Sequence, residues 1–172
     1  NPAFIIIFGS IFSVMWVKLD QIGKNPSIPM KFALGILQLG AGFLITLVGL
    51  QFANEEAMVP LLTLVFLYLL HTTGELFLSP IGLSMVTKLS PKSMAGTAMG
   101  GWFLSFAIAN YAGGLIASLT GGHGDSGEEV TAAAGLVKYT DVFATIGWTC
   151  VGIAVLIALL NKPLNKLMHG VK

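Results

Sequence analysis

One carboxylate lies alone in an otherwise uncharged stretch of the sequence. Between Ala57 and Thr87, Glu75 is the only Asp, Glu, Lys or Arg, and it sits close to the midpoint. A charge at the centre of a membrane helix costs roughly 2.5–3.5 kcal/mol on insertion scales, so such a residue is expected to have a function. Dehydration favours the neutral acid, whereas an incoming ammonium group favours the carboxylate. Glu75 is therefore a candidate both for carrying a proton and for binding a cationic group.

Two further polar side chains are predicted to share a helix face with Glu75. His71 and Ser79 lie four residues before and after it, and residues four apart are neighbours on a helix. Lipid would not tolerate this face, so we expect it to line a water-filled path or the interior of a bundle. For His71, a hydrogen bond to another helix and a role in proton transfer both remain open.

A helix that carries Glu75 should bend shortly after it. Pro80 cannot donate a backbone hydrogen bond and clashes with the preceding turn, and Gly82 loosens the next one. Such a bend suits a gating helix, although a static kinked helix has one as well. Further along, Trp102 and Phe103 fall well inside another apolar stretch, where Trp102 either closes against a cavity or packs in the core or against lipid.

The composition is that of a membrane protein. Hydrophobic residues make up 55% of the chain, charged residues 10%, and the mean hydropathy is +0.83. The single cysteine, Cys150, excludes a disulfide framework, and no basic run suggests nucleic-acid binding. No metal-ligand cluster, nucleophile–base pair or cofactor fingerprint is present, so we expect neither an enzyme nor a bound metal or cofactor. The chain starts at Asn1 without an initiator Met, and we expect it to be a fragment.

Five apolar runs predict an all-α membrane fold with five transmembrane helices. Each run is continuous rather than alternating, which argues against a β-barrel. The chain forms one domain, residues 1–172, with helices expected at about 3–19, 32–54, 57–87, 93–120 and 142–161. The connections sort the charges: eight of the nine lysines fall in one set of loops, and only Lys138 falls in the other. By the positive-inside rule the first set, and with it the C-terminus, is cytoplasmic.

Several motifs resemble the proton-dependent oligopeptide transporters, the peptide and nitrate branch of the major facilitator superfamily. They include Lys31-Phe-Ala-Leu-Gly35, Gly74-Glu-Leu-Phe-Leu-Ser-Pro-Ile-Gly-Leu-Ser84, Thr87-Lys-Leu-Ser-Pro91 and Gly100-Gly-Trp-Phe-Leu104. The resemblance runs from Asn1-Pro-Ala-Phe-Ile to about Gly122 and implies that the chain corresponds to spanning helices eight to twelve. These would form part of the C-terminal six-helix bundle of a transporter in the cell membrane, the bacterial inner membrane being expected.

The resemblance also implies roles for individual residues. Glu75 would meet the amino group of a bound peptide, with Ser79 lining the same pocket and Asn1 near that amino end. Trp102 and Phe103 would form the pocket floor and the cytoplasmic gate. A proton moving inward would drive uptake of di- and tripeptides while the two bundles rock about a central site. The N-terminal bundle of the same transporter would then be a partner, together with the lipid bilayer.

Other functions remain open at this stage. A relative that carries nitrate or a single amino acid is one alternative, although a carboxylate would repel nitrate unless it were neutralised. A membrane scaffold without transport activity, in which Glu75 only joins helices, is another. This stretch of chain offers no intramembrane Lys or Arg for a peptide carboxylate, so that contact would have to come from elsewhere.

Overall fold

The computed structural model describes residues 2–54, 58–120 and 132–168. These residues form helices and connecting turns without a strand, which confirms the predicted all-α fold. Five helices are long and one is short. In chain order they are α1 (Pro2–Gln21), α2 (Ile28–Leu50), α3 (Leu61–Leu89), α4 (Ala95–Thr120), α5 (Ala132–Leu159) and α6 (Asn161–Leu167).

Three helices differ from the ranges expected at 32–54, 57–87 and 142–161. The second begins at Ile28 because Ser27 has extended backbone angles and a proline occupies its first turn. The third begins only after Pro60 and continues to Leu89. The fifth begins well before residue 142, at Ala132, and its regular winding ends at Leu159, where the short helix α6 follows. Charged residues were taken as helix limits, and several of them lie inside helices instead.

Four of the long helices are long and apolar enough to cross a membrane. They are α1, α2, α3 and residues 138–159 of α5. The remaining long helix, α4, has 26 residues and no charged side chain. Large apolar side chains such as Ile6, Leu104 and Leu159 point outward along these helices. Apolar surface of this extent suits contact with lipid.

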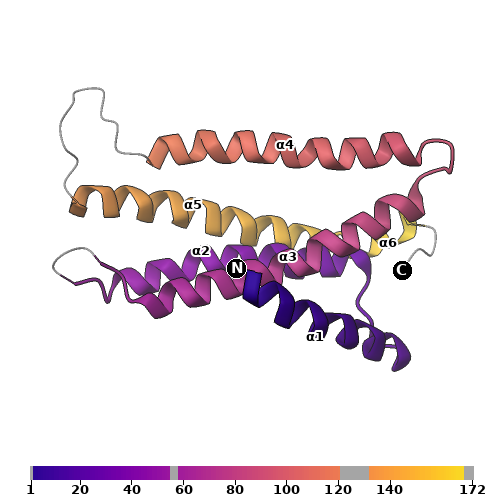
Figure 1. Ribbon diagram of the computed structural model, residues 1–172, viewed down its shortest axis with the longest axis horizontal. Helices are drawn as coiled ribbons and strands as arrows, with labels where there is room; N and C mark the ends of the chain where they lie inside the picture. The colour runs from indigo at the N-terminus through magenta and orange to yellow at the C-terminus, as the bar shows by residue number, and fades with distance from the viewer. Residues whose placement is uncertain (1, 55–57, 121–131, 169–172) are drawn as a thin grey trace.

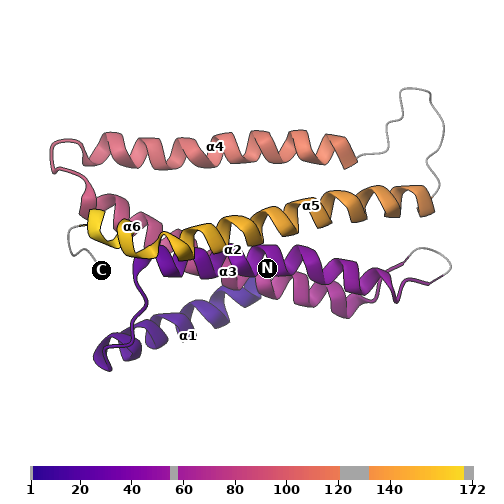
Figure 2. The ribbon, with the colours of Figure 1, turned by 180° about the vertical axis from the view of Figure 1, so that it is seen from behind.

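The second helix is the centre of the bundle. It lies between α3 and α5 and packs against both along most of its length (Figures 1 and 2). The contact with α3 is close because glycines meet: a Cβ atom on Gly35 would lie 3.0 Å from the carbonyl oxygen of Gly74. On the other side, Gly40 faces the backbone of Gly147 of α5. Small residues allow this approach, which is how helices associate in membranes.

The lysine-bearing helix ends gather at one end of the molecule. Figure 1 shows the C-terminal ends of α1 and α3, the start of α2 and the short helix α6 on the same side. Lys31 lies inside α2, buried, with its ammonium nitrogen 4.5 Å from the centre of the Trp16 ring. This cation–π contact explains how the lysine is accommodated within a helix.

Candidate functional site

A cavity of about 840 Å³ lies between α2, α3 and α4. Most of its wall is apolar, and a few polar side chains converge on it. The third helix contributes His71, Glu75 and Ser79, and the fourth contributes Ser105 and Asn110. Apolar pockets of roughly 300–1,000 Å³ with a few convergent polar groups are typical of small-ligand sites.

The predicted polar face of α3 therefore lines this cavity as one row. His71, Glu75 and Ser79 follow each other at one-turn intervals because α3 runs as a continuous helix through this stretch. Glu75 is exposed, and no hydrogen bond or ion pair engages it within the described part of the chain. Its carboxylate is thus available to a ligand rather than joined to a neighbouring helix.

His71 lies where the cavity meets the interface between α2 and α3. Its ring packs on the Phe43 ring, with centroids 4.6 Å apart, and against the backbone of Gly42, where a Cβ atom would overlap it. The Nε2 atom is buried, on the side of the ring that faces Gly42. The ring therefore presents Nε2 to the interface with α2 rather than to the cavity.

The indole of Trp102 forms part of the cavity wall and packs directly over a glycine of α3. A Cβ atom on Gly82 of α3 would overlap the far edge of the Trp102 ring, so only glycine leaves room for the indole. The Phe106 ring lies edge-on to it at 5.9 Å. Of the two interpretations open for Trp102, this position favours the one in which it closes against a cavity.

A second cavity of about 280 Å³ adjoins the first. Glu75, Ser79 and Trp102 line both, and Pro80 and Phe103 line the second. The C-terminal part of α3, which follows Pro80 inside the helix, bends toward the start of α4 (Figure 1). The structure thus brings together all the predicted site residues except Asn1, which lies outside the described residues.

Sequence reasoning missed two polar residues of the site, Ser105 and Asn110. The amide nitrogen of Asn110 donates a hydrogen bond to the Phe106 carbonyl at 2.8 Å, which directs a polar group to the face that also carries Trp102. Positions 102, 105, 106, 109 and 110 follow the spacing of one helix face. This spacing could have identified both residues once Trp102 was placed at a cavity.

The cavity presents acceptors and aromatic surface, and its lining residues include no Lys or Arg. It is therefore suited to a ligand with a cationic or hydrogen-bond-donating end. In the described part of the chain, no three His, Cys, Asp or Glu side chains come close enough together to hold a metal ion.

The chain is similar to known peptide transporters. Residues 1–132 match the POT family. The chain is 33% identical over 171 residues to dipeptide and tripeptide permease B of Aeromonas hydrophila, and 36% identical over 170 residues to dipeptide and tripeptide permease A of Edwardsiella piscicida. Each alignment covers 99% of this chain and 34% of the relative. The chain thus spans about a third of the length of these relatives.

Solved structures show the same likeness. A crystal structure of the peptide transporter POT in complex with sulfate has a TM-score of 0.72 and 32% identity, covering 99% of this chain and 31% of that one. A mutant of a peptide transporter POT in complex with alafosfalin gives a TM-score of 0.71 at 32% identity, covering 99% of this chain and 32% of that one. These matches confirm the transporter-type helical fold expected from the sequence motifs.

Proposed function

The chain belongs to the POT family, whose members are transporters rather than enzymes, and from this we propose that it is part of a proton-coupled transporter of di- and tripeptides. The names of the relatives, dipeptide and tripeptide permeases, support peptides as the substrate class. In this proposal residues 1–172 supply spanning helices eight to twelve of the C-terminal bundle. The N-terminal bundle supplies the other half of the substrate site.

The observation that carries the proposal is the position of Glu75. Its carboxylate is exposed in a cavity of ligand size whose walls are mostly apolar and whose lining residues, all in the described part of the chain, include no Lys or Arg. The ammonium group of a peptide would supply the missing positive charge, and a charge-assisted hydrogen bond is roughly twice as strong as a neutral one. Ser79, one turn away, would add a hydrogen bond to the same end of the peptide.

The remaining predicted residues act around this contact in the proposal. Trp102 forms the floor of the pocket, and Phe103 forms the gate, with Pro80 and Gly82 allowing α3 to bend beside it. Asn1 is proposed to lie near the peptide amino group. The positions of Trp102, Phe103 and Pro80 on the walls of the two adjoining cavities support their roles.

Proton coupling is assigned to Glu75 and His71. A protonated Glu75 and a peptide-bound Glu75 exclude each other at any instant, which would link the movement of the two ligands. His71 lies one turn away on the same cavity wall, which supports its part in the proposal. The carboxylate of the peptide needs a cation, which we assign to the N-terminal bundle because these cavity walls offer none.

The proposed location is a bacterial inner membrane with the C-terminus in the cytoplasm. The gathering of lysine-bearing helix ends at one end of the molecule supports this orientation. Nitrate is a less suitable substrate for this site, because Glu75 would repel an anion. A single amino acid has the same ammonium group as a peptide and remains the second candidate substrate.

The test is transport by the full-length protein in proteoliposomes with an inward proton gradient. The wild type should accumulate a labelled dipeptide, and Glu75→Gln should reduce this accumulation at least about tenfold. Dipeptide and N-acetylated dipeptide are compared as competitors. Loss of a charge-assisted contact of about 1.5–3 kcal/mol predicts a preference of roughly 10- to 100-fold for the free amino group in the wild type, and little preference in the variant.

Asp141→Asn serves as the matched control, because it also turns an exposed acid of a described helix into an amide and lies outside the cavity. It should transport as the wild type does. A wild type that transports nothing would identify a scaffold. A Glu75→Gln variant that still prefers the free amino group would refute the assigned role of this carboxylate.

A further inference from the structure

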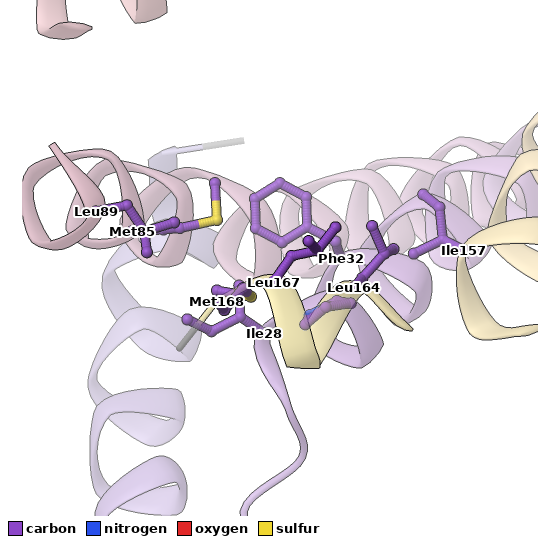
Figure 3. A pocket seen from close by; sticks show the side chains of 9 residues that line it. Ile28, Phe32, Met85, Leu89, Ile157, Leu164, Leu167 and Met168 are labelled. Carbon is purple, nitrogen blue, oxygen red and sulfur yellow. The ribbon is translucent and has the colours of Figure 1, made fainter. Parts of the chain in front are cut away.

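At the lysine-rich end of the bundle, a second region of the molecule has the features of a binding site. An open apolar cavity of about 350 Å³ lies there, and it shares only the Phe32 side chain with the cavity of Glu75. Figure 3 shows side chains from four helices, α2, α3, α5 and α6, directed toward it. The lining residues include Ile28, Phe32, Met85, Leu89, Ile157 and Leu164.

Every side chain that lines this cavity is apolar. The cavity therefore has no group with which to orient a peptide, a nucleotide or a metal ion. It lies where three membrane-spanning helices end, and its contents must suit both the apolar wall and the nearby membrane surface. A hydrocarbon chain from the bilayer meets this requirement.

The short helix α6 adds a charged edge to the apolar wall. Lys162 and Lys166 are exposed and four residues apart, so they lie on one side of α6, whereas Leu164 faces the cavity. The hydroxyl of Ser27 donates a hydrogen bond to the side-chain oxygen of Asn161, at 2.5 Å, which ties the start of α6 to the start of α2. The two lysines are thus held beside the cavity.

The surrounding charge selects an anionic partner. Among the described residues, the helix ends and connections on this side carry seven lysines and one acidic residue, Asp20. Basic pockets between membrane helices on the cytoplasmic side bind the head groups of acidic lipids, and a short basic amphipathic helix favours an anionic bilayer surface.

We propose that this cavity binds one acyl chain of an acidic phospholipid whose phosphate pairs with Lys162 and Lys166. The site is distinct from the substrate cavity, and its existence does not depend on which solute the transporter carries. The lipid would hold α6 against the ends of α2, α3 and α5, in the same place as the hydrogen bond between Ser27 and Asn161.

Native mass spectrometry of the full-length transporter tests the charged half of the proposal. The detergent-solubilised protein is titrated with phosphatidylglycerol and with phosphatidylcholine of identical acyl chains. The wild type should retain phosphatidylglycerol preferentially. In the double variant Lys162→Gln/Lys166→Gln, the preference for phosphatidylglycerol over phosphatidylcholine should fall about fivefold for each lysine removed, which corresponds to about 1 kcal/mol per lysine. Lys138→Gln, at the other end of α5, should bind as the wild type does.

A cavity-filling variant tests the apolar half. Ile157→Trp should reduce retention of both lipids, because the indole occupies the volume of the acyl chain. Ile153→Trp, one turn earlier on the same helix and outside the cavity lining, should retain both. Inorganic phosphate in excess should not displace the lipid, since it cannot fill an apolar cavity. Displacement of the lipid by phosphate would show that the site binds only an anion and would contradict the proposal.

Thermal unfolding gives an independent measurement. A ligand that binds the folded state raises the melting temperature. Phosphatidylglycerol should therefore stabilise the wild type, but neither Ile157→Trp nor the double variant Lys162→Gln/Lys166→Gln. Equal phosphatidylglycerol preference in the wild type and the double lysine variant would overturn the proposal. Undiminished lipid retention by a folded Ile157→Trp variant would do the same.

Discussion

At the scale of single residues, Glu75 and His71 show two ways of placing a polar group inside an apolar bundle. Glu75 is exposed to a cavity and makes no contact with a protein cation among the described residues. His71 is held by ring packing on Phe43 and by its fit against Gly42, where Nε2 is buried. The packing fixes the imidazole, and proton exchange through its ring is a proposed second role.

His71→Phe separates these two properties. The phenyl ring has nearly the same shape as the imidazole and can retain the packing on Phe43, so the free energy of unfolding should change by about 1.5 kcal/mol or less. Proton-driven accumulation of dipeptide should fall severalfold, whereas exchange of dipeptide across the membrane without a proton gradient should persist. Both transport modes are measured in the same proteoliposomes. Unchanged accumulation would show that His71 has only a packing role.

The sequence was sufficient to predict that α3 presents a row of three polar side chains on one face. The lack of other charges around Glu75 and the four-residue spacing of His71 and Ser79 need no partner helix to be interpreted. The contribution of Asn110 and the fit of Trp102 against Gly82 depend on how α4 is placed along α3. That register is a property of the packed pair of helices, and neither helix specifies it alone.

At the scale of helices, the packing of α2 against α3 depends on small residues. Gly35, Gly42 and Gly49 are spaced seven residues apart, and each faces a side chain or the backbone of α3. Opposite Gly35 lies Gly74, directly before Glu75, so a close backbone contact between the two helices fixes the helix turn that carries the carboxylate. Without a hydrophobic driving force between helices in lipid, such close packing provides much of the association energy.

Gly35→Ala should therefore destabilise the full-length protein by about 1–3 kcal/mol. The added Cβ atom would lie 2.8 Å from the Leu78 side chain and 3.0 Å from the Gly74 carbonyl oxygen, and the backbone atom cannot move aside cheaply. Gly152→Ala is the control, because no atom lies within 4 Å of its Cβ position. Thermal unfolding in detergent measures both. A melting temperature that is equally unaffected in the two variants would contradict the importance of this contact.

The sequence predicted the number of long helices better than their limits. Lys31 was taken to precede α2, yet the helix includes it because the Trp16 ring accommodates the ammonium group. Lys138 and Asp141 were placed before the last long helix and lie inside it. A charged residue does not end a helix where an aromatic ring receives it or where the helix extends beyond the apolar layer.

At the scale of the whole molecule, the two ends of the bundle differ in charge. The end with α6 carries most of the lysines and the apolar cavity, whereas Lys138 belongs to the opposite end of α5. This asymmetry is what sets the orientation of a membrane protein during insertion. The proposed lipid site lies at the lysine-rich end of the bundle, and the proposed substrate site lies at a different depth of the same bundle.

Labelling with a membrane-impermeant maleimide tests the orientation. In a cysteine-free background of the full-length protein, which includes Cys150→Ala, Lys138→Cys should react in intact cells. Lys166→Cys should react only after the membrane is permeabilised, because we place it in the cytoplasm. Both positions are exposed, so accessibility does not limit the reaction. The reverse labelling pattern would invert the proposed topology.

The fit of the Trp102 indole over Gly82 has a mechanical consequence. The indole occupies the space that a side chain on Gly82 would fill, so sliding of α4 along α3 would first require the ring to leave this position. Any swing of α3 about Pro80 would consequently carry the indole, and the wall built on it, in the same direction. In the proposed transporter, opening on one side of the membrane would then move α3 and α4 together.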